Sequence, residues 1–146
     1  MEADAYPDSP FLVSLHRADS FHDAAHAFLS KAALSLAFTP LHRIEVHNAL
    51  RNAAASGDLK AAERALAFKQ IDEDLRDGLL IHVPVNWTDV FRRADDLSEN
   101  HAATEGQRTM DLLHVAVALE SGAKTFLSFD QRQSKLAKAA GLKVKP

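Results

Sequence analysis

Short apolar runs alternate along the chain with longer stretches in which apolar residues recur every three or four positions. Runs of the first kind predict buried strands, and the second pattern predicts helices that bury one face. Five segments are predicted strands, the first of them the weakest: Ala5–Pro7, Leu36–Thr39, Leu80–Val83, Thr125–Phe129 and Leu142–Val144.

Glycine and proline mark the ends of the predicted helices. Pro10 follows Ser9 and Pro40 follows Thr39, and a hydroxyl residue at the N-cap with proline next to it is typical of a helix start. Helices commonly end at a glycine in the left-handed conformation, and four glycines each follow a helical pattern: Gly57, Gly78, Gly122 and Gly141.

The C-terminal third shows the clearest order of elements. A helix is predicted from about Arg108 to Ser121, followed by the strand Thr125–Phe129 and by a second helix, which Asp130 caps and which runs to Ala140. A strand–helix–strand unit joins parallel strands with a right-handed crossover. Because strands and helices alternate throughout, we expect an α/β fold: a three-layer α/β/α arrangement with a central parallel sheet of four to five strands. Residues 1–146 are expected to form a single domain.

Composition and charge narrow the class of protein. The chain has 146 residues, 47% hydrophobic and 25% charged, which excludes a disordered chain and a coiled-coil rod. It has no cysteine, which excludes disulfides and thiolate metal sites and favours the cytoplasm. No apolar run approaches the roughly 20 residues that span a bilayer, so no membrane association is expected. The net charge of −3 means that any nucleic-acid contact must be local or metal-mediated.

Four carboxylates are candidates for the functional site, because parallel sheets bind ligands at the carboxyl ends of their strands. Asp8 follows the first predicted strand, and Asp130 follows the strand Thr125–Phe129. Glu45 lies at the edge of the apolar stripe of the helix that Thr39 opens. Asp111 lies in a helix that is apolar nearly all round, where an ionised carboxylate is costly unless it is paired or bound to a metal.

Each carboxylate also has a purely structural interpretation. Asp8 and Asp130 could be N-caps, Glu45 could pair with Arg43 or Arg51, and Asp111 could pair with Arg108. These interpretations are harder to sustain together, because all four residues can be assigned to one edge of one sheet. Hard oxygen ligands without cysteine suit Mg²⁺ or Mn²⁺, and such an ion activates water and neutralises phosphate charge.

Three further patterns each have two interpretations. His22 and His26 have the i, i+4 spacing of zinc ligands, but surface histidines are favoured on a helix whose predicted core stripe includes Phe21 and Ala25. His114 lies three residues after Asp111, and a buried, hydrogen-bonded histidine is favoured over a ligand. The amphipathic stretch Leu59–Leu79 is interpreted as core packing or as a groove for a partner.

Residues 8–15, residues 38–50 and several stretches of the C-terminal half form an ordered set of motifs; the C-terminal stretches are residues 108–116, 122–123, 126–133, 136–137 and 140–142. This set resembles the PIN domain family, and within it the VapC-type toxins of bacterial toxin–antitoxin pairs. Residues 8–15 resemble the first acidic motif of the family, and residues 38–50 resemble its second. One position departs from the family pattern, because Pro7 stands where an apolar residue is usual. Since proline cannot donate to a sheet ladder, we expect the first strand to be short or distorted.

The resemblance implies an Mg²⁺- or Mn²⁺-dependent ribonuclease whose acidic positions are Asp8, Glu45, Asp111 and Asp130. It also implies that Ser9 is the small hydroxyl residue of the first motif, that the protein forms homodimers, and that a cognate antitoxin silences it. Arg108 and Arg132 are the basic residues nearest the acidic set in sequence and are weak candidates for RNA contacts. Two other functions stay open: a non-catalytic α/β binding module, and a metal-dependent hydrolase of small phosphate compounds.

Overall fold

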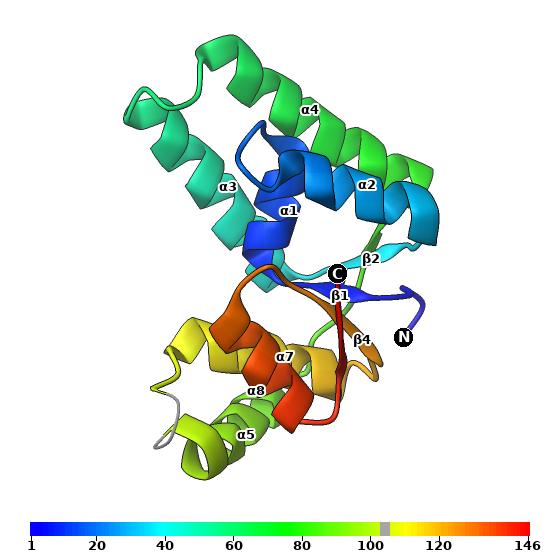
Figure 1. The fold of residues 1–146 in the computed structure, drawn as a ribbon, viewed down its shortest axis with the longest axis vertical. Helices are drawn as coiled ribbons and strands as arrows, with labels where there is room; N and C mark the ends of the chain where they lie inside the picture. Colours follow the sequence, from blue (N-terminus) through cyan, green and yellow to red (C-terminus); the bar gives the residue numbers. More distant parts are fainter. Residues whose placement is uncertain (103–105) are drawn as a thin grey trace.

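The computed structural model describes residues 1–102 and 106–146 (Figure 1). In chain order the elements are β1 (Tyr6–Pro7), α1 (Ser9–His16), α2 (His22–Ala32), β2 (Leu36–Phe38), α3 (Pro40–Ala55), α4 (Ala61–Asp77), β3 (Leu80–His82), α5 (Trp87–Leu97), the short π-helix η1 (Ser98–Ala102), α7 (Thr109–Glu120), β4 (Thr125–Leu127), α8 (Gln131–Ala139) and β5 (Lys143–Lys145).

The strands form a parallel sheet in the order β3–β2–β1–β4–β5. Regular pairing joins β2 to β3 and joins β1, β4 and β5 to one another. The two parts meet at a parallel bridge between Ala5 and Leu36, where Ala37 N–H also donates to the Ala5 carbonyl at 2.9 Å. The prediction of a central parallel sheet of four to five strands is therefore confirmed.

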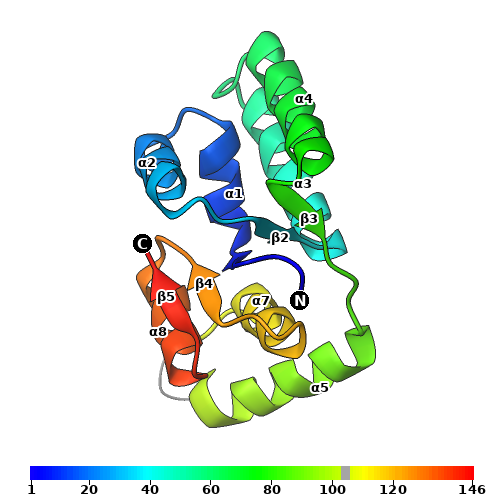
Figure 2. The ribbon, with the colours of Figure 1, turned by 90° about the vertical axis from the view of Figure 1, so that its right-hand side faces the viewer.

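Helices cover both faces of this sheet, as Figures 1 and 2 show. Helices α1 to α4 lie on one face, and α5, α7 and α8 lie on the other. Because successive residues of a strand point to opposite faces, Tyr6 and Phe126 pack in the core beneath α7 and α8, whereas Ala5 and Leu127 pack in the core beneath α1 and α3. The predicted three-layer α/β/α arrangement is confirmed.

Helix starts follow the predicted chemistry with one correction. Thr39 caps α3 and Pro40 follows it, as predicted. The first helix, however, begins at Ser9 and not after it: Asp8 is the N-cap, and its side chain accepts a hydrogen bond from Phe11 N–H. A carboxylate satisfies this backbone donor at least as well as the serine hydroxyl would.

Strand β1 has only two residues, and Pro7 accounts for its end. Proline has no N–H to continue the ladder. The Pro7 carbonyl instead accepts a hydrogen bond from His42 Nε2–H at 2.7 Å, so a buried side chain of α3 takes over where the strand pairing stops. The next residue, Asp8, is held in register because its N–H donates to the Leu127 carbonyl of β4 at 2.9 Å.

Two predicted apolar stripes are only partly buried. Within the amphipathic stretch Leu59–Leu79, Ala67 and Ile71 of α4 are buried, as core packing predicts, but Leu66 is 53% exposed. On α2, Ala25 is buried as expected, but Phe21 is 47% exposed because it is the N-cap of the helix and lies outside its periodic face. Among the described residues, none of the helices is long and apolar enough to cross a membrane.

Candidate active site

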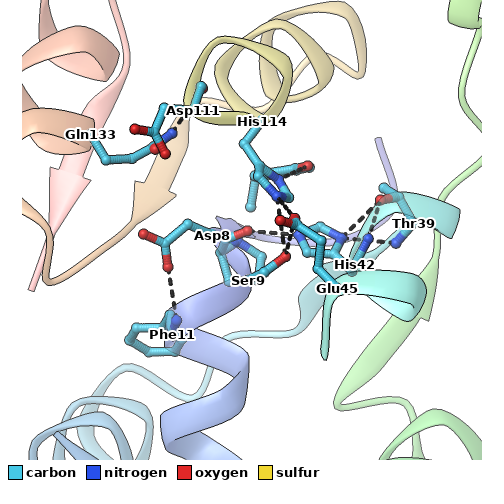
Figure 3. A network of polar contacts seen from close by, with 11 residues as sticks. Asp8, Ser9, Phe11, Thr39, His42, Glu45, Asp111, His114 and Gln133 are labelled. Carbon is cyan, nitrogen blue, oxygen red and sulfur yellow. Dashed lines mark hydrogen bonds and ion pairs between the residues drawn. The ribbon is translucent and has the colours of Figure 1, made fainter. Parts of the chain in front are cut away.

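Four carboxylates from four separate segments line one cavity of about 370 Å³. Asp8 follows β1, Glu45 lies on α3, Asp111 lies in the first turn of α7, and Asp130 precedes α8. The cavity lies at the carboxyl ends of β1 and β4, where ligand sites of parallel sheets are found. Figure 3 shows Asp8 at the start of α1, with Asp111 on α7 and Glu45 on α3 on either side of His114.

Asp8 is buried and accepts two hydrogen bonds. Its Oδ1 accepts from Phe11 N–H at 2.8 Å, and its Oδ2 accepts from the Ser128 hydroxyl at 2.5 Å. Burial raises the pKa of Asp8 to about 6, although both of these hydrogen bonds oppose the rise. The chain therefore holds this carboxylate in a fixed orientation while making its ionisation costly.

Asp130 combines the two interpretations that its sequence position allows. It is the N-cap of α8, because its Oδ1 accepts from Gln133 N–H at 2.9 Å. Its own N–H donates to the Ser128 hydroxyl oxygen at 3.0 Å, so Ser128 ties Asp130 to Asp8. Capping occupies one carboxylate oxygen, and Asp130 still lines the cavity. An N-cap and a site residue are thus compatible roles here.

Glu45 is held by a chain of buried side chains (Figure 3). Its Oε1 accepts from the Ser9 hydroxyl at 2.8 Å and also contacts Nε2 of His114. Nδ1 of His114 lies 2.8 Å from the Tyr6 hydroxyl, which closes the chain on the other side of the ring. Burial opposes ionisation of Glu45, but the hydrogen bond and the electrostatic attraction of His114, together with Ser9, outweigh it and lower the pKa of Glu45. Glu45 is therefore an ionised, oriented carboxylate.

His42 is a buried histidine that packs against this network and joins α3 to the end of β1. Thr39 N–H donates to His42 Nδ1 at 2.9 Å, so Nδ1 carries the lone pair and Nε2 carries the hydrogen that Pro7 accepts. Burial lowers the pKa of His42 well below its ordinary value, in agreement with a neutral ring. This ring packs at a tilt against both Tyr6 and His114, with centroids 4.7 and 5.2 Å away.

Asp111 pairs with an exposed arginine. Arg108 Nε lies 3.4 Å from Asp111 Oδ2, and Arg108 Nη2 lies 4.0 Å from Asp130 Oδ2. Burial raises the pKa of Asp111, and the charge of Arg108 opposes that shift. The structural ion pair considered from the sequence is thus present. Gln133 fixes the backbone here, because its side-chain amide donates to the Asp111 carbonyl at 3.0 Å.

The structure places the weaker sequence candidates differently. Ser9 contacts Glu45 and His114, and Arg108 lines the cavity, whereas Arg132 is exposed on α8 and is not among the cavity-lining residues. His114 is buried and hydrogen-bonded, as favoured from the sequence, and it also contacts a candidate site residue.

Sequence reasoning missed three residues that hold the site: Tyr6, Ser128 and Gln133. Tyr6 and His114 are 108 positions apart, so no local pattern joins them. Ser128 offered a signal, since this polar residue, two positions before Asp130, stands between the apolar residues Leu127 and Phe129. Gln133 lies at the N3 position of a capped helix, where it is expected to interact with the N-terminal end of its own helix and not with Asp111.

The donor set suits a hard divalent cation by its chemistry. Four carboxylates and the Ser9 hydroxyl offer oxygen ligands of the kind that Mg²⁺ and Mn²⁺ prefer. Within the described residues, however, no three His, Cys, Asp or Glu side chains stand as a ready metal site. Asp111 Oδ2 is turned to Arg108, so ion binding would require that oxygen to exchange partners, whereas Glu45 meets both His114 and Ser9 through Oε1. The residues fit such an ion, with that adjustment.

The histidines of α2 are each bonded to the backbone of α1. His22 Nδ1–H donates to the Ser14 carbonyl, and His26 Nε2–H donates to the Leu15 carbonyl, both at 2.8 Å. These bonds fasten α2 to α1. The described part of the chain arranges no third ligand with them, so the zinc interpretation of their spacing has no support.

The family model of the PIN domain matches residues 5–139, so the chain belongs to the PIN domain family. No curated protein sequence matches it. Among solved structures it is similar to VapC20 of Mycobacterium tuberculosis, a toxin that cleaves the sarcin–ricin loop, with a TM-score of 0.66 and 17% identity over 97% of this chain and 99% of that one.

Two other solved structures show the same fold. VapBC2 of Rickettsia felis, bound to a DNA fragment from its promoter, and FitAcB of Neisseria gonorrhoeae each have a TM-score of 0.66 and 14% identity, over 97% of this chain and 96% of the matched chain. At such identities the likeness concerns the fold, and it confirms the PIN-like architecture expected from the sequence.

Proposed function

We propose that the protein is a metal-dependent endoribonuclease. The observation that carries the proposal is the convergence of Asp8, Glu45, Asp111 and Asp130 on one cavity at the carboxyl ends of two adjacent parallel strands. Ordinary capping and ion pairing explain these residues one at a time. They give no reason for four of them to face the same cavity in a PIN fold.

In this proposal Asp8, Glu45 and Asp111 hold Mg²⁺ or Mn²⁺, and Asp130 completes the site directly or through water. When bound, such an ion lowers the pKa of water and neutralises phosphate charge. The contributions of the chain are orientation and charge. His114 and Ser9 keep Glu45 ionised and aimed, and Ser128 fixes Asp8 relative to Asp130. Hydrolysis by in-line attack of water leaves a 5′-phosphate and a 3′-hydroxyl.

We further propose that the enzyme is the toxin of a toxin–antitoxin pair and acts as a cytoplasmic homodimer. Similarity to VapC20 and to VapBC2 supports this proposal. Two apolar side chains on the adjacent helices α3 and α4, Ile44 and Leu66, are more than half exposed and offer surface for a protein partner. An antitoxin that places one Arg or Lys among the four carboxylates would neutralise the cavity.

The decisive experiment is cleavage of a defined single-stranded RNA by purified protein in Mg²⁺ or Mn²⁺. We expect products with 5′-phosphates, no cleavage in excess chelator, and loss of cleavage in Asp8→Asn. RNA cleavage that persists in chelator and in Asp8→Asn would contradict the proposal. Hydrolysis of small phosphate esters without RNA cleavage would support the small-molecule hydrolase, and neither activity would support the binding module.

The toxin assignment needs its own test. Co-expression with the product of the neighbouring upstream gene should give a soluble complex without ribonuclease activity. Replacing the inserted basic residue of that partner by Ala should then weaken inhibition more than binding. A protein that is harmless when overexpressed and indifferent to any neighbouring gene product would contradict the toxin assignment and leave the nuclease assignment in place.

A further inference from the structure

Three phenylalanine rings form a stack that runs from the core to the surface beside the acidic cavity. The rings of Phe11 and Phe129 have centroids 5.4 Å apart and planes 16° apart, and those of Phe129 and Phe21 are 4.7 Å and 11° apart. Phe11 is completely buried, Phe129 is half-buried, and Phe21 is 47% exposed. The inner end of the stack, Phe11, is therefore buried in the core, and its outer end, Phe21, is an aromatic ring open to solvent.

This stack is fixed to the candidate active site at two points. Phe11 N–H donates to Asp8, and Phe129 directly precedes Asp130 in the chain. The outer ring is held as well, because Phe21 N–H donates to Asp19 Oδ1 at 3.0 Å while Asp19 Oδ2 accepts from the Ser14 hydroxyl at 2.9 Å. The exposed ring is thus held by the backbone on one side and by stacking on the other.

A second cavity of about 340 Å³ is lined by the open ring and borders the acidic cavity. Its lining includes Phe21, Pro10, Val13 and Glu45. Pro10 and Glu45 line the acidic cavity as well, so the two cavities share a wall. A volume above about 300 Å³ with apolar walls and a few polar groups is typical of small-molecule sites.

The charge of the protein favours a non-electrostatic contact with RNA. With a net charge of −3, and with four carboxylates at the centre of the site, the protein as a whole offers RNA no bulk electrostatic attraction. Stacking of bases on aromatic side chains supplies affinity that does not depend on protein charge and tolerates any base. An exposed ring that already ends an aromatic stack is a suitable surface for it.

We propose that Phe21 is the stacking platform for a nucleobase next to the scissile phosphate. This inference rests on the proposed ribonuclease function and deepens it by assigning a substrate contact. The base extends the series Phe11, Phe129, Phe21 by one member, and its sugar–phosphate backbone passes the shared wall of Pro10 and Glu45 to reach the acidic cavity.

The test compares Phe21→Leu, which keeps apolar area but removes the ring face, with Phe21→Trp, which keeps a ring face. Phe91→Leu on α5 is the matched control, because Phe91 is 58% exposed and contacts Trp87 away from both cavities. Cleavage kinetics are measured on RNA carrying 2-aminopurine at successive positions, whose fluorescence is quenched by stacking. Melting curves confirm that every variant is folded.

We expect Phe21→Leu to raise KM about tenfold with kcat nearly unchanged, and to abolish quenching at one position beside the cleavage site. Phe21→Trp and Phe91→Leu should stay close to wild type. Wild-type KM and quenching in Phe21→Leu would overturn the proposal, and relief of inhibition by a partner protein without any change in KM would show that the ring serves protein docking instead. Position-specific quenching without cleavage would support base stacking on Phe21 and overturn the ribonuclease assignment. Absence of both quenching and cleavage would overturn the stacking role and the ribonuclease assignment.

Discussion

The two pairs of carboxylates in the acidic cavity differ in what holds them. Asp8 and Glu45, the fixed pair, accept hydrogen bonds from buried groups of the chain itself, among them Ser128 and His114. Asp111 and Asp130, the arginine-facing pair, share the guanidinium of Arg108, whose side chain is 71% exposed. A buried network cannot rearrange cheaply, whereas an exposed ion pair contributes little and exchanges readily.

This difference separates orientation from cation binding. The fixed pair is oriented before any ligand arrives, because its partners are completed within the fold. The arginine-facing pair already attracts a positive charge, because Arg108 contacts Oδ2 of each of its two carboxylates. A divalent ion or a basic side chain of a partner would therefore meet carboxylates whose present partner is easy to displace. The predictions below test this contrast.

The largest effect is expected on catalysis. Asp8→Asn, Glu45→Gln and Asp111→Asn should each lower kcat for RNA cleavage by about three orders of magnitude or more, because the three carboxylates act as one unit on one ion. Asp130→Asn should cost less if it acts through water. The measurement is single-turnover cleavage under saturating Mn²⁺. Equal and small losses in all four variants would show that the cavity is not the catalytic site.

The next effect is a pH dependence of stability that belongs to Asp8 of the fixed pair. Burial raises the pKa of Asp8 from 3.8 to about 6, so the folded state binds the proton more tightly than the unfolded state. The stability this provides is fully present below pH 3.8 and is lost as pH rises through 6. At pH 7 the loss amounts to about 3 kcal/mol.

Urea unfolding of wild type and Asp8→Asn in chelator, between pH 4 and pH 7, measures this effect. The free energy of unfolding of wild type should fall relative to that of Asp8→Asn over this range by up to about 3 kcal/mol. Parallel curves for the two proteins would mean that Asp8 ionises in the fold as easily as in the unfolded chain, and that burial of this carboxylate carries no electrostatic cost.

These contrasts also show what the sequence can and cannot predict. The alternation of strands and helices and the position of Asp8 and Asp130 after strands follow from local patterns, and so the layers and the edge of the sheet were predictable. The contact between Tyr6 and His114 was not, because it depends on how β1 and α7 pack in three dimensions. Phe21 was assigned to the core because helical periodicity does not show that α2 begins only at His22, with Phe21 as its N-cap.

A smaller effect concerns metal binding by the arginine-facing pair. Mg²⁺ or Mn²⁺ at about a hundredfold over its Kd should add about 2.7 kcal/mol to wild-type stability, by mass action. Asp111→Asn should abolish this response and stabilise the metal-free protein, because burial raises the pKa of Asp111 and makes its ionised form costly. Differential scanning calorimetry with and without metal measures both. A variant that loses stability without metal yet keeps the metal response would show that Asp111 stabilises the fold through its ion pair with Arg108 and does not bind the metal ion.

The smallest effect is a change in Mn²⁺ affinity that we expect on substitution of Arg108 but not of Arg132. Because the Arg108 side chain is largely exposed, Arg108→Gln should change the free energy of unfolding by less than about 1 kcal/mol. It should nevertheless strengthen Mn²⁺ binding in the absence of RNA, because it removes a positive charge that faces Asp111 and Asp130. Arg132→Gln is the matched control: it removes the same charge from an exposed position of α8 that does not line the cavity, and it should leave Mn²⁺ affinity unchanged. Equal changes in the two variants, measured by calorimetric titration, would mean that Arg108 acts only through net charge and that its contacts with the acidic pair have no local consequence.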